Sequence, residues 1–163
     1  MYERLQIESL LQDQGPRRER GIGLYLMPDE VYARRVFDEA VRPAMRENAL
    51  EIGSRVVVFD SDSNLADVTR ELQRAEVIVA EMSASNAALY YALGLAHGLR
   101  RCPLLVTQEP FSLPFNLGAL RWVQYQDTHE GMRELREHLS RAIRVFLAAA
   151  RTSSEGGGAS DST

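Results

Sequence analysis

The 163-residue sequence contains no lysine, and all 19 of its basic residues are arginines. Mechanisms that need an amine side chain are therefore excluded, among them Schiff-base catalysis and phosphate binding by the lysine of a Walker or kinase motif. Cysteine is almost as scarce. The single cysteine, Cys102, rules out a disulfide within the chain, as is typical of a cytoplasmic protein.

Other absences narrow the class of protein further. No apolar run is long enough to span a membrane and the N-terminal residues lack a signal-peptide pattern, so we expect a cytoplasmic protein without a membrane partner. A net charge of −4 argues against a general nucleic-acid-binding surface. The three histidines and one cysteine are too dispersed for a metal site. Cys102 is expected to be a packed thiol because no base is indicated beside it.

The feature around which the chain is organised is an apolar run at residues 75–83, followed by a polar turn and an apolar helical pattern at residues 87–99. A second apolar run follows at residues 103–107. A strand, a crossover helix and a strand of these lengths predict a right-handed βαβ unit with parallel strands. Because ligands bind beyond the carboxyl ends of strands in open parallel sheets, the turn at residues 81–86 is the first candidate for a site.

Alternating strands and helices are predicted along the rest of the chain. Further strands are expected at residues 21–27, 56–59 and 122–125. Helices are expected at residues 31–48, from about residue 65 onward, and at residues 132–150. Pro43 is expected to kink or break the first of these helices. This alternation predicts a three-layer α/β domain with five largely parallel strands.

The domain is expected to occupy residues 21–151. Residues 1–20 are predicted to be a helical or flexible lead-in, with a short helix around Leu5 and Leu10. Residues 152–163 are rich in serine and glycine and are predicted to be a disordered tail.

Four segments share a pattern with a known family. They are Leu-Tyr-Leu-Met-Pro at residues 24–28, Val-Arg-Pro-Ala at residues 41–44, the strand at residues 75–83, and the run from Asn86 through Leu99. In these segments the chain resembles the nucleoside 2-deoxyribosyltransferase-like group, which includes bacterial TIR-like domains that cleave NAD or bind nucleotides. The resemblance spans about residues 21–150. It implies a flavodoxin-like sheet with strand order 2-1-3-4-5 and helices on both faces.

The chain departs from this family at the position of the catalytic carboxylate. Active members carry glutamate in the segment Tyr-Glu-Leu-Gly, and Ala92 stands there in this sequence. Breaking an N-glycosidic bond develops positive charge on the ribose, which a carboxylate stabilises and a methyl group does not. A substitute catalytic carboxylate would have to come from a strand end, and the candidates are Glu81, Asp60 and Asp62.

Residues near the predicted strand ends are the candidates for ligand binding. Asn86 is expected to cap the helix at residues 87–99, whose first backbone N–H groups then offer an anion site. Asp60 and Asp62 either hold ribose hydroxyls or a cation, or belong to an ordinary capped loop. His97 is expected to be a packed helix residue instead of a base. The full set of ligand-binding candidates is Met27, Pro28, Asp60, Asp62, Ser83, Ser85, Asn86, Tyr90 and Ala92.

Three functions remain open from the sequence. The first is a nucleotide- or nucleoside-binding domain that has lost turnover, with NAD or another nucleotide as a ligand and no required cofactor. The second is an active N-glycosidase, either an NAD hydrolase or a deoxyribosyltransferase, that uses Glu81 or another carboxylate. The third is an assembly module that forms a homo-oligomer through the last helix, in which Phe146 and Leu147 continue the apolar stripe.

Overall fold

The computed structural model describes residues 18–58, 65–84, 86–108 and 122–155. Its elements alternate along the chain, and the α/β class with a parallel sheet is confirmed. The elements are β1 (Ile22–Met27), α2 (Val31–Val36), the π-helix η1 (Phe37–Val41), α3 (Arg42–Glu47), β2 (Glu51–Val58), α4 (Leu65–Arg74), β3 (Val77–Glu81), α5 (Ala87–Gly98), β4 (Leu104–Thr107), β5 (Trp122–Gln124) and α6 (His129–Glu155).

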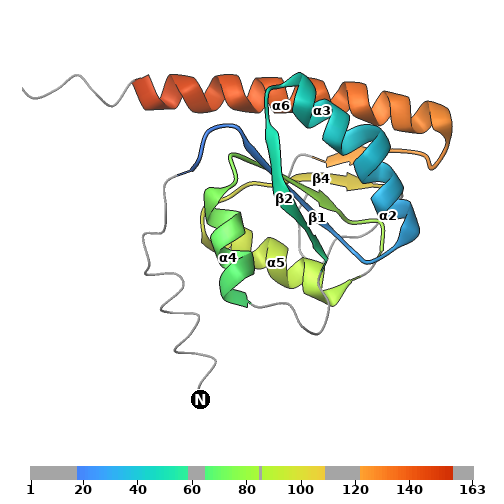
Figure 1. Cartoon of the computed structure of the whole chain (residues 1–163), viewed down its shortest axis with the longest axis horizontal. Coiled ribbons are helices and arrows are strands. Elements are labelled where there is room, and N and C mark those ends of the chain that lie inside the picture. Colours follow the sequence, from blue (N-terminus) through green and yellow to red (C-terminus); the bar gives the residue numbers. More distant parts are fainter. Residues whose placement is uncertain (1–17, 59–64, 85, 109–121, 156–163) are drawn as a thin grey trace, which may run out of the picture.

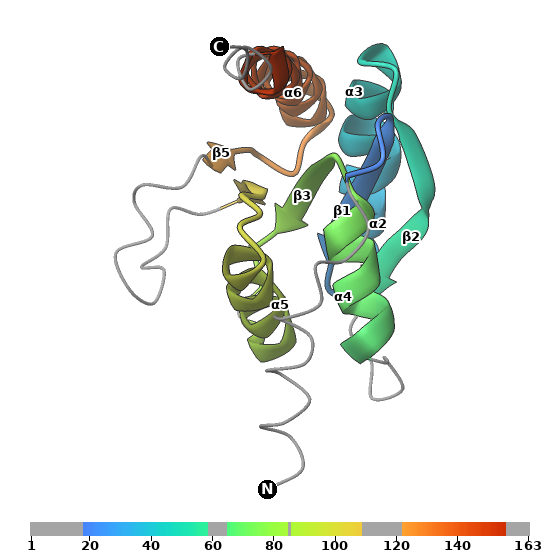
Figure 2. The same cartoon turned by 90° about the vertical axis from the view of Figure 1, so that its left-hand side faces the viewer.

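All strand pairs in the sheet are parallel, and the order across it is β2-β1-β3-β4-β5 (Figures 1 and 2). Each parallel pair needs a connection that returns the chain to the same end of the sheet, and helices supply this connection between β1 and β2, β2 and β3, and β3 and β4. The registers of β3 with β4 and of β4 with β5 place Glu81, Thr107 and Gln124 along one edge. The carboxyl ends of these strands therefore form a common edge.

The two faces of the sheet bury separate apolar clusters. Along β3, Val77 and Val79 join the cluster under α2, η1, α3 and α6, whereas Ile78 and Ala80 join the cluster under α4 and α5. This alternation follows from the two-residue repeat of a strand. Figures 1 and 2 show the two helical layers on opposite sides of the sheet. Within the described segments, no helix is long and apolar enough to cross a membrane.

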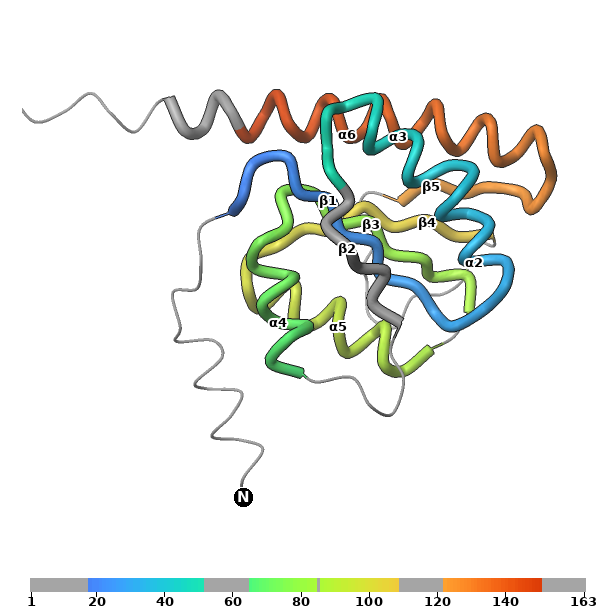
Figure 3. Tube along the Cα trace, in the orientation of Figure 1, coloured from blue at the N-terminus to red at the C-terminus, as the bar shows by residue number. Residues whose placement is uncertain are grey.

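Pro43 shapes the helical segment between β1 and β2. The proline has no N–H to donate to the carbonyl four residues earlier, so a regular helix cannot continue through it unchanged. Here the chain widens into η1, in which the Arg42 N–H donates to the Phe37 carbonyl five residues earlier. The path nevertheless continues from α2 to α3 (Figure 3). Phe37 stacks on Tyr25 at a ring separation of 5.5 Å, and the Arg42 guanidinium lies 5.3 Å from the Phe37 ring.

Two element boundaries differ from those expected. The strand β2 begins at Glu51 instead of residue 56, because Glu51 already pairs with Ile22 of β1 and its N–H donates to the Gly21 carbonyl. Helix α6 continues to Glu155, so residues 152–155 are helical and not part of a tail. The helix extends beyond its last apolar residues because propagation from an existing helix costs little. The expected N-terminal helix and the proline-rich segment at residues 109–117 lie outside the described residues.

The prediction for Cys102 is wrong. Its thiol is exposed and not packed. The neighbouring Arg101 and Pro103 are buried instead, so the chain turns the cysteine outward at the start of β4.

Candidate functional site

A buried carboxylate lies at the carboxyl edge of the sheet. Glu81, the last residue of β3, is fully buried, with an exposed fraction of 0%. The backbone N–H of Ser83 donates to its Oε1 atom at 2.8 Å, and the Tyr125 hydroxyl donates to its Oε2 atom at 2.9 Å. Both oxygens therefore have a donor, as a buried carboxylate requires.

Polar side chains connect this carboxylate to the surface. The backbone N–H of Gln108 donates to Ser83 Oγ at 2.8 Å, and Gln108 Nε2 donates to Tyr125 Oη at 3.3 Å. Gln124 Nε2 donates to the Gln108 carbonyl at 3.3 Å. Ser83 and Gln108 are half-buried and Gln124 is exposed. We call Glu81, Ser83, Gln108, Gln124 and Tyr125 the carboxyl-edge network.

Two further tyrosines lie close enough to Glu81 to respond to its charge. Burial, and then the charge of Glu81, raises the pKa of Tyr25 well above its ordinary range. Burial and the charges of Glu81 and Glu30 raise the pKa of Tyr32 to about 12. The Tyr25 hydroxyl donates to the Ala33 carbonyl at 3.4 Å. The Tyr32 Oη atom is buried and has no hydrogen-bond partner among the described residues.

Burial also raises the pKa of Glu81, and hydrogen bonds from Ser83 and Tyr125 offset part of this rise. The pKa of Tyr125 is raised as well, first by burial and then by the charge of Glu81. A carboxyl group of this kind takes up a proton more readily than an exposed one. In chemical terms Glu81 is suited to hold or donate a proton, whereas a nucleophile would need an oxygen free to attack.

Ala92 lies on the opposite side of the sheet from Glu81. It is fully buried in the apolar cluster under α4 and α5, together with Leu89, Leu93 and Ala96 of the same helix. Tyr125, the hydroxyl partner of Glu81, belongs to the other cluster. Glu81 and Ala92 therefore lie on opposite faces of the sheet.

Asn86 caps α5 as expected. Its Oδ1 atom accepts from the N–H groups of Ala88 at 2.9 Å and Leu89 at 3.2 Å. These are two of the N–H groups that the predicted anion site needs, so the cap leaves fewer donors for a ligand.

The other predicted residues fall into three groups. Ser83 joins the carboxyl-edge network. Met27 and Pro28 are buried, with Met27 in the core, and Tyr90 is half-buried against the α5 cluster. Their packing gives each a structural role. The remaining candidates, Asp60, Asp62 and Ser85, lie outside the described residues.

Sequence reasoning missed Tyr125 and Gln108. Each follows directly after a strand, β5 and β4 respectively, so the rule that ligands meet the carboxyl ends of strands pointed to them. The hydrogen bonds to Glu81 and Ser83 depend on strand order and register, which are tertiary properties.

The described part of the chain holds no cluster of three or more side chains suited to a metal ion. His97 is half-buried on α5, and within the described residues its buried Nε2 atom has no hydrogen-bond partner. His129 and His138 are exposed.

Neither a family model nor a curated protein matches the chain.

Proposed function

We propose that this chain is a nucleotide- or nucleoside-binding domain, flavodoxin-like and TIR-like, that has lost N-glycosidic cleavage. The ligand would bind at the carboxyl edge of the sheet. One observation carries the proposal: position 92 is an alanine inside an apolar cluster, while Glu81, the one candidate carboxylate that the structure describes, faces the other cluster with both oxygens hydrogen-bonded.

The chemistry of the bond explains why this arrangement favours binding without turnover. Cleavage of an N-glycosidic bond needs a carboxylate at the anomeric carbon, either to attack it or to stabilise its charge. Glu81 would have to give up a donor and become exposed before it reached a substrate. Losing a group of this kind typically lowers the rate by several orders of magnitude.

In the proposal, ligand hydroxyls are held by the half-buried members of the carboxyl-edge network. Ser83 offers a hydroxyl and Gln108 offers an amide. Glu81 holds both residues in place, because it accepts hydrogen bonds from the Ser83 backbone and from the Tyr125 hydroxyl, to which Gln108 donates. The hydroxyl of Tyr32 has no acceptor among the described residues and offers a further donor, since a buried polar atom without a partner gains most from a new one.

A second function, an active N-glycosidase using Glu81, is favoured by one observation. Burial raises the pKa of Glu81, and carboxyl groups with raised pKa values serve as general acids at neutral pH. Such an acid would protonate the leaving base instead of attacking the sugar.

The test combines binding and cleavage on the full chain. Calorimetry with NAD, ADP-ribose and deoxynucleosides is expected to show binding of at least one, with no cleavage of NAD or deoxynucleosides by chromatography. Tyr32→Phe removes a hydroxyl for which the described residues supply no acceptor, so we expect normal folding and about five- to tenfold weaker binding. Tyr91→Phe, at an exposed tyrosine, is the matched control and should bind as the wild type does.

Two results would overturn the proposal. Folded protein that binds none of these compounds would remove the binding function. Cleavage by the wild type that disappears in Glu81→Gln would establish the N-glycosidase instead.

A further inference from the structure

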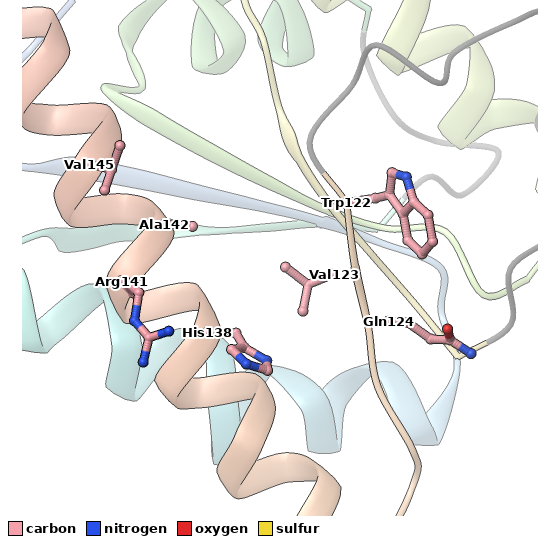
Figure 4. Close-up of a pocket in the computed structure, with 7 residues that line it drawn as sticks. All are labelled: Trp122, Val123, Gln124, His138, Arg141, Ala142 and Val145. Carbon is pink, nitrogen blue, oxygen red and sulfur yellow. The ribbon is translucent and has the colours of Figure 1, made fainter.

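A groove runs between the edge strand β5 and helix α6, with a cavity volume of about 470 Å³ (Figure 4). Four of its residues, at positions 138, 141, 142 and 145, form one stripe on α6, and three consecutive residues come from β5. It meets the carboxyl-edge network only at Gln124. The lining residues are Trp122, Val123, Gln124, His138, Arg141, Ala142 and Val145.

The groove leaves apolar surface and backbone without partners. Trp122 is 46% exposed and Val145 is 49% exposed, and together they make up half of the four exposed large apolar side chains in the described segments. Strand β5 pairs with β4 on one side, and its other edge carries no strand in the part of the chain that the structure describes. Such an edge is a template for another strand.

The charge of the groove is one-sided. Arg141 and His138 line it, and none of its lining residues is acidic. On the same helix Arg133 forms ion pairs with Glu130 and Glu137, and Arg136 pairs with Glu47. Arg141 takes part in none of the ion pairs found among the described residues. Among the described residues Arg141 therefore has a free charge to offer to an acidic partner.

We propose that this groove binds an extended, acidic peptide segment of another protein, which adds to β5 as a further strand. A cleft between an edge strand and a helix is the geometry used for strand addition, where main-chain hydrogen bonds give affinity and side-chain pockets give specificity. Apolar side chains of the peptide would cover Ala142 and Val145. An acidic side chain, two residues away on the same face, would pair with Arg141.

A second copy of this chain is a less suitable occupant. Phe146 and Leu147, the residues expected to form an oligomer, pack against or within the domain's own core. A two-fold interface centred on the groove would also bring Arg141 close to its own counterpart, and like charges placed together oppose association.

The experiment selects peptides from a displayed library of random decapeptides against the immobilised full chain. We expect enrichment of sequences that combine alternating apolar residues with aspartate or glutamate. The selected peptide is then titrated against the protein and followed by the fluorescence of Trp122, the one tryptophan of the sequence.

Matched variants separate this site from general electrostatic attraction. Arg141→Glu is expected to weaken binding by about tenfold or more, because the peptide carboxylate then faces a like charge. Arg144→Glu, an exposed arginine of the same helix outside the lining, should change binding less than about threefold. A peptide with lysine in place of its acidic residues, and one with a central proline, should both fail to bind.

Several outcomes would overturn the proposal. They are the absence of any enriched sequence, enrichment without acidic residues, and equal effects of the two arginine variants. A dimer in light scattering that is lost in Val145→Asp would identify a second copy as the occupant and would also overturn it. None of these results depends on nucleotide binding.

Discussion

The two ends of the sheet each bury one charged side chain, and their partners differ. At the amino end Arg101, 7% exposed, donates to three backbone carbonyls: those of Leu72 at 2.9 Å, Gln73 at 2.5 Å and Ala75. At the carboxyl end Glu81 accepts from the Ser83 backbone and from the Tyr125 hydroxyl, behind which lies a chain of further polar side chains.

The difference indicates that Arg101 is a structural charge, whereas the protonation of Glu81 can change. Arg101 donates to carbonyls at and just beyond the C-terminal end of α4. A helix leaves its last carbonyls without N–H partners of its own, so the guanidinium satisfies them instead. Burial, and then the charge of Arg18, lowers the pKa of Arg101 to about 10, so it stays charged at neutral pH. Glu81 has a raised pKa and one donor, the Tyr125 hydroxyl, that belongs to a side chain, so both its charge and this contact can change.

The largest change in the free energy of unfolding is expected when a third buried charge, without hydrogen-bond partners, is introduced. Ala92→Glu places a carboxylate in a fully apolar, fully buried position, and we expect a loss of about 4 kcal/mol in the free energy of unfolding. Urea denaturation measures it.

The neighbouring exposed position is the control for that variant. Tyr91→Glu, at a side chain that is 48% exposed on the same helix, should change the free energy of unfolding by less than about 1 kcal/mol. Equal stability of Ala92→Glu and the wild type would mean that α5 presents position 92 to solvent.

A smaller loss is expected when Arg101 is removed. Arg101→Met keeps most of the aliphatic stem but leaves three carbonyls without their donor, which should cost about 3 kcal/mol. Arg100→Met, at an exposed neighbouring arginine, should stay within about 0.5 kcal/mol of the wild type. If the two variants unfold at the same urea concentration, the contrast between the two ends of the sheet fails.

The smallest effect concerns Glu81 and depends on pH. Because its pKa is raised in the folded state from the ordinary 4.5, the folded protein binds this proton more tightly than the unfolded chain does. The Glu81 contribution to stability therefore falls as the pH rises from about 4.5 to the raised pKa, and is constant above it. Glu81→Gln should lack this fall when urea midpoints are compared across the pH range.

Tyr125→Phe is a second test of the pH dependence of stability attributed to Glu81. It removes a hydrogen bond that holds the pKa of Glu81 down, so the fall in stability should extend to higher pH than in the wild type. A wild-type profile identical to that of Glu81→Gln would show that Glu81 titrates normally and is not buried.

The helices and strands could be predicted from local sequence patterns, because the formation of each one depends mainly on residues close together in the chain. The apolar run before Glu81 and the cap at Asn86 are visible in the sequence, and so is the position of Glu81 at a carboxyl edge. The face onto which Glu81 points depends on register, and its partner Tyr125 lies 44 residues away. Arg101 bridges 26 to 29 residues to reach its carbonyls, so its burial, and with it the exposure of Cys102, was invisible locally.

The π turn η1, just before Pro43, rotates α3 about the helix axis relative to α2. One extra residue in a turn advances the following helix by about 100° relative to an uninterrupted α-helix. That advance lets Ala33 and Val36 before the turn, and Ala44 and Met45 after it, all enter the same core cluster. Deleting one residue from η1 would restore a regular helical period and turn α3 away from the sheet, so this segment tolerates substitution on its outer face better than any change in length.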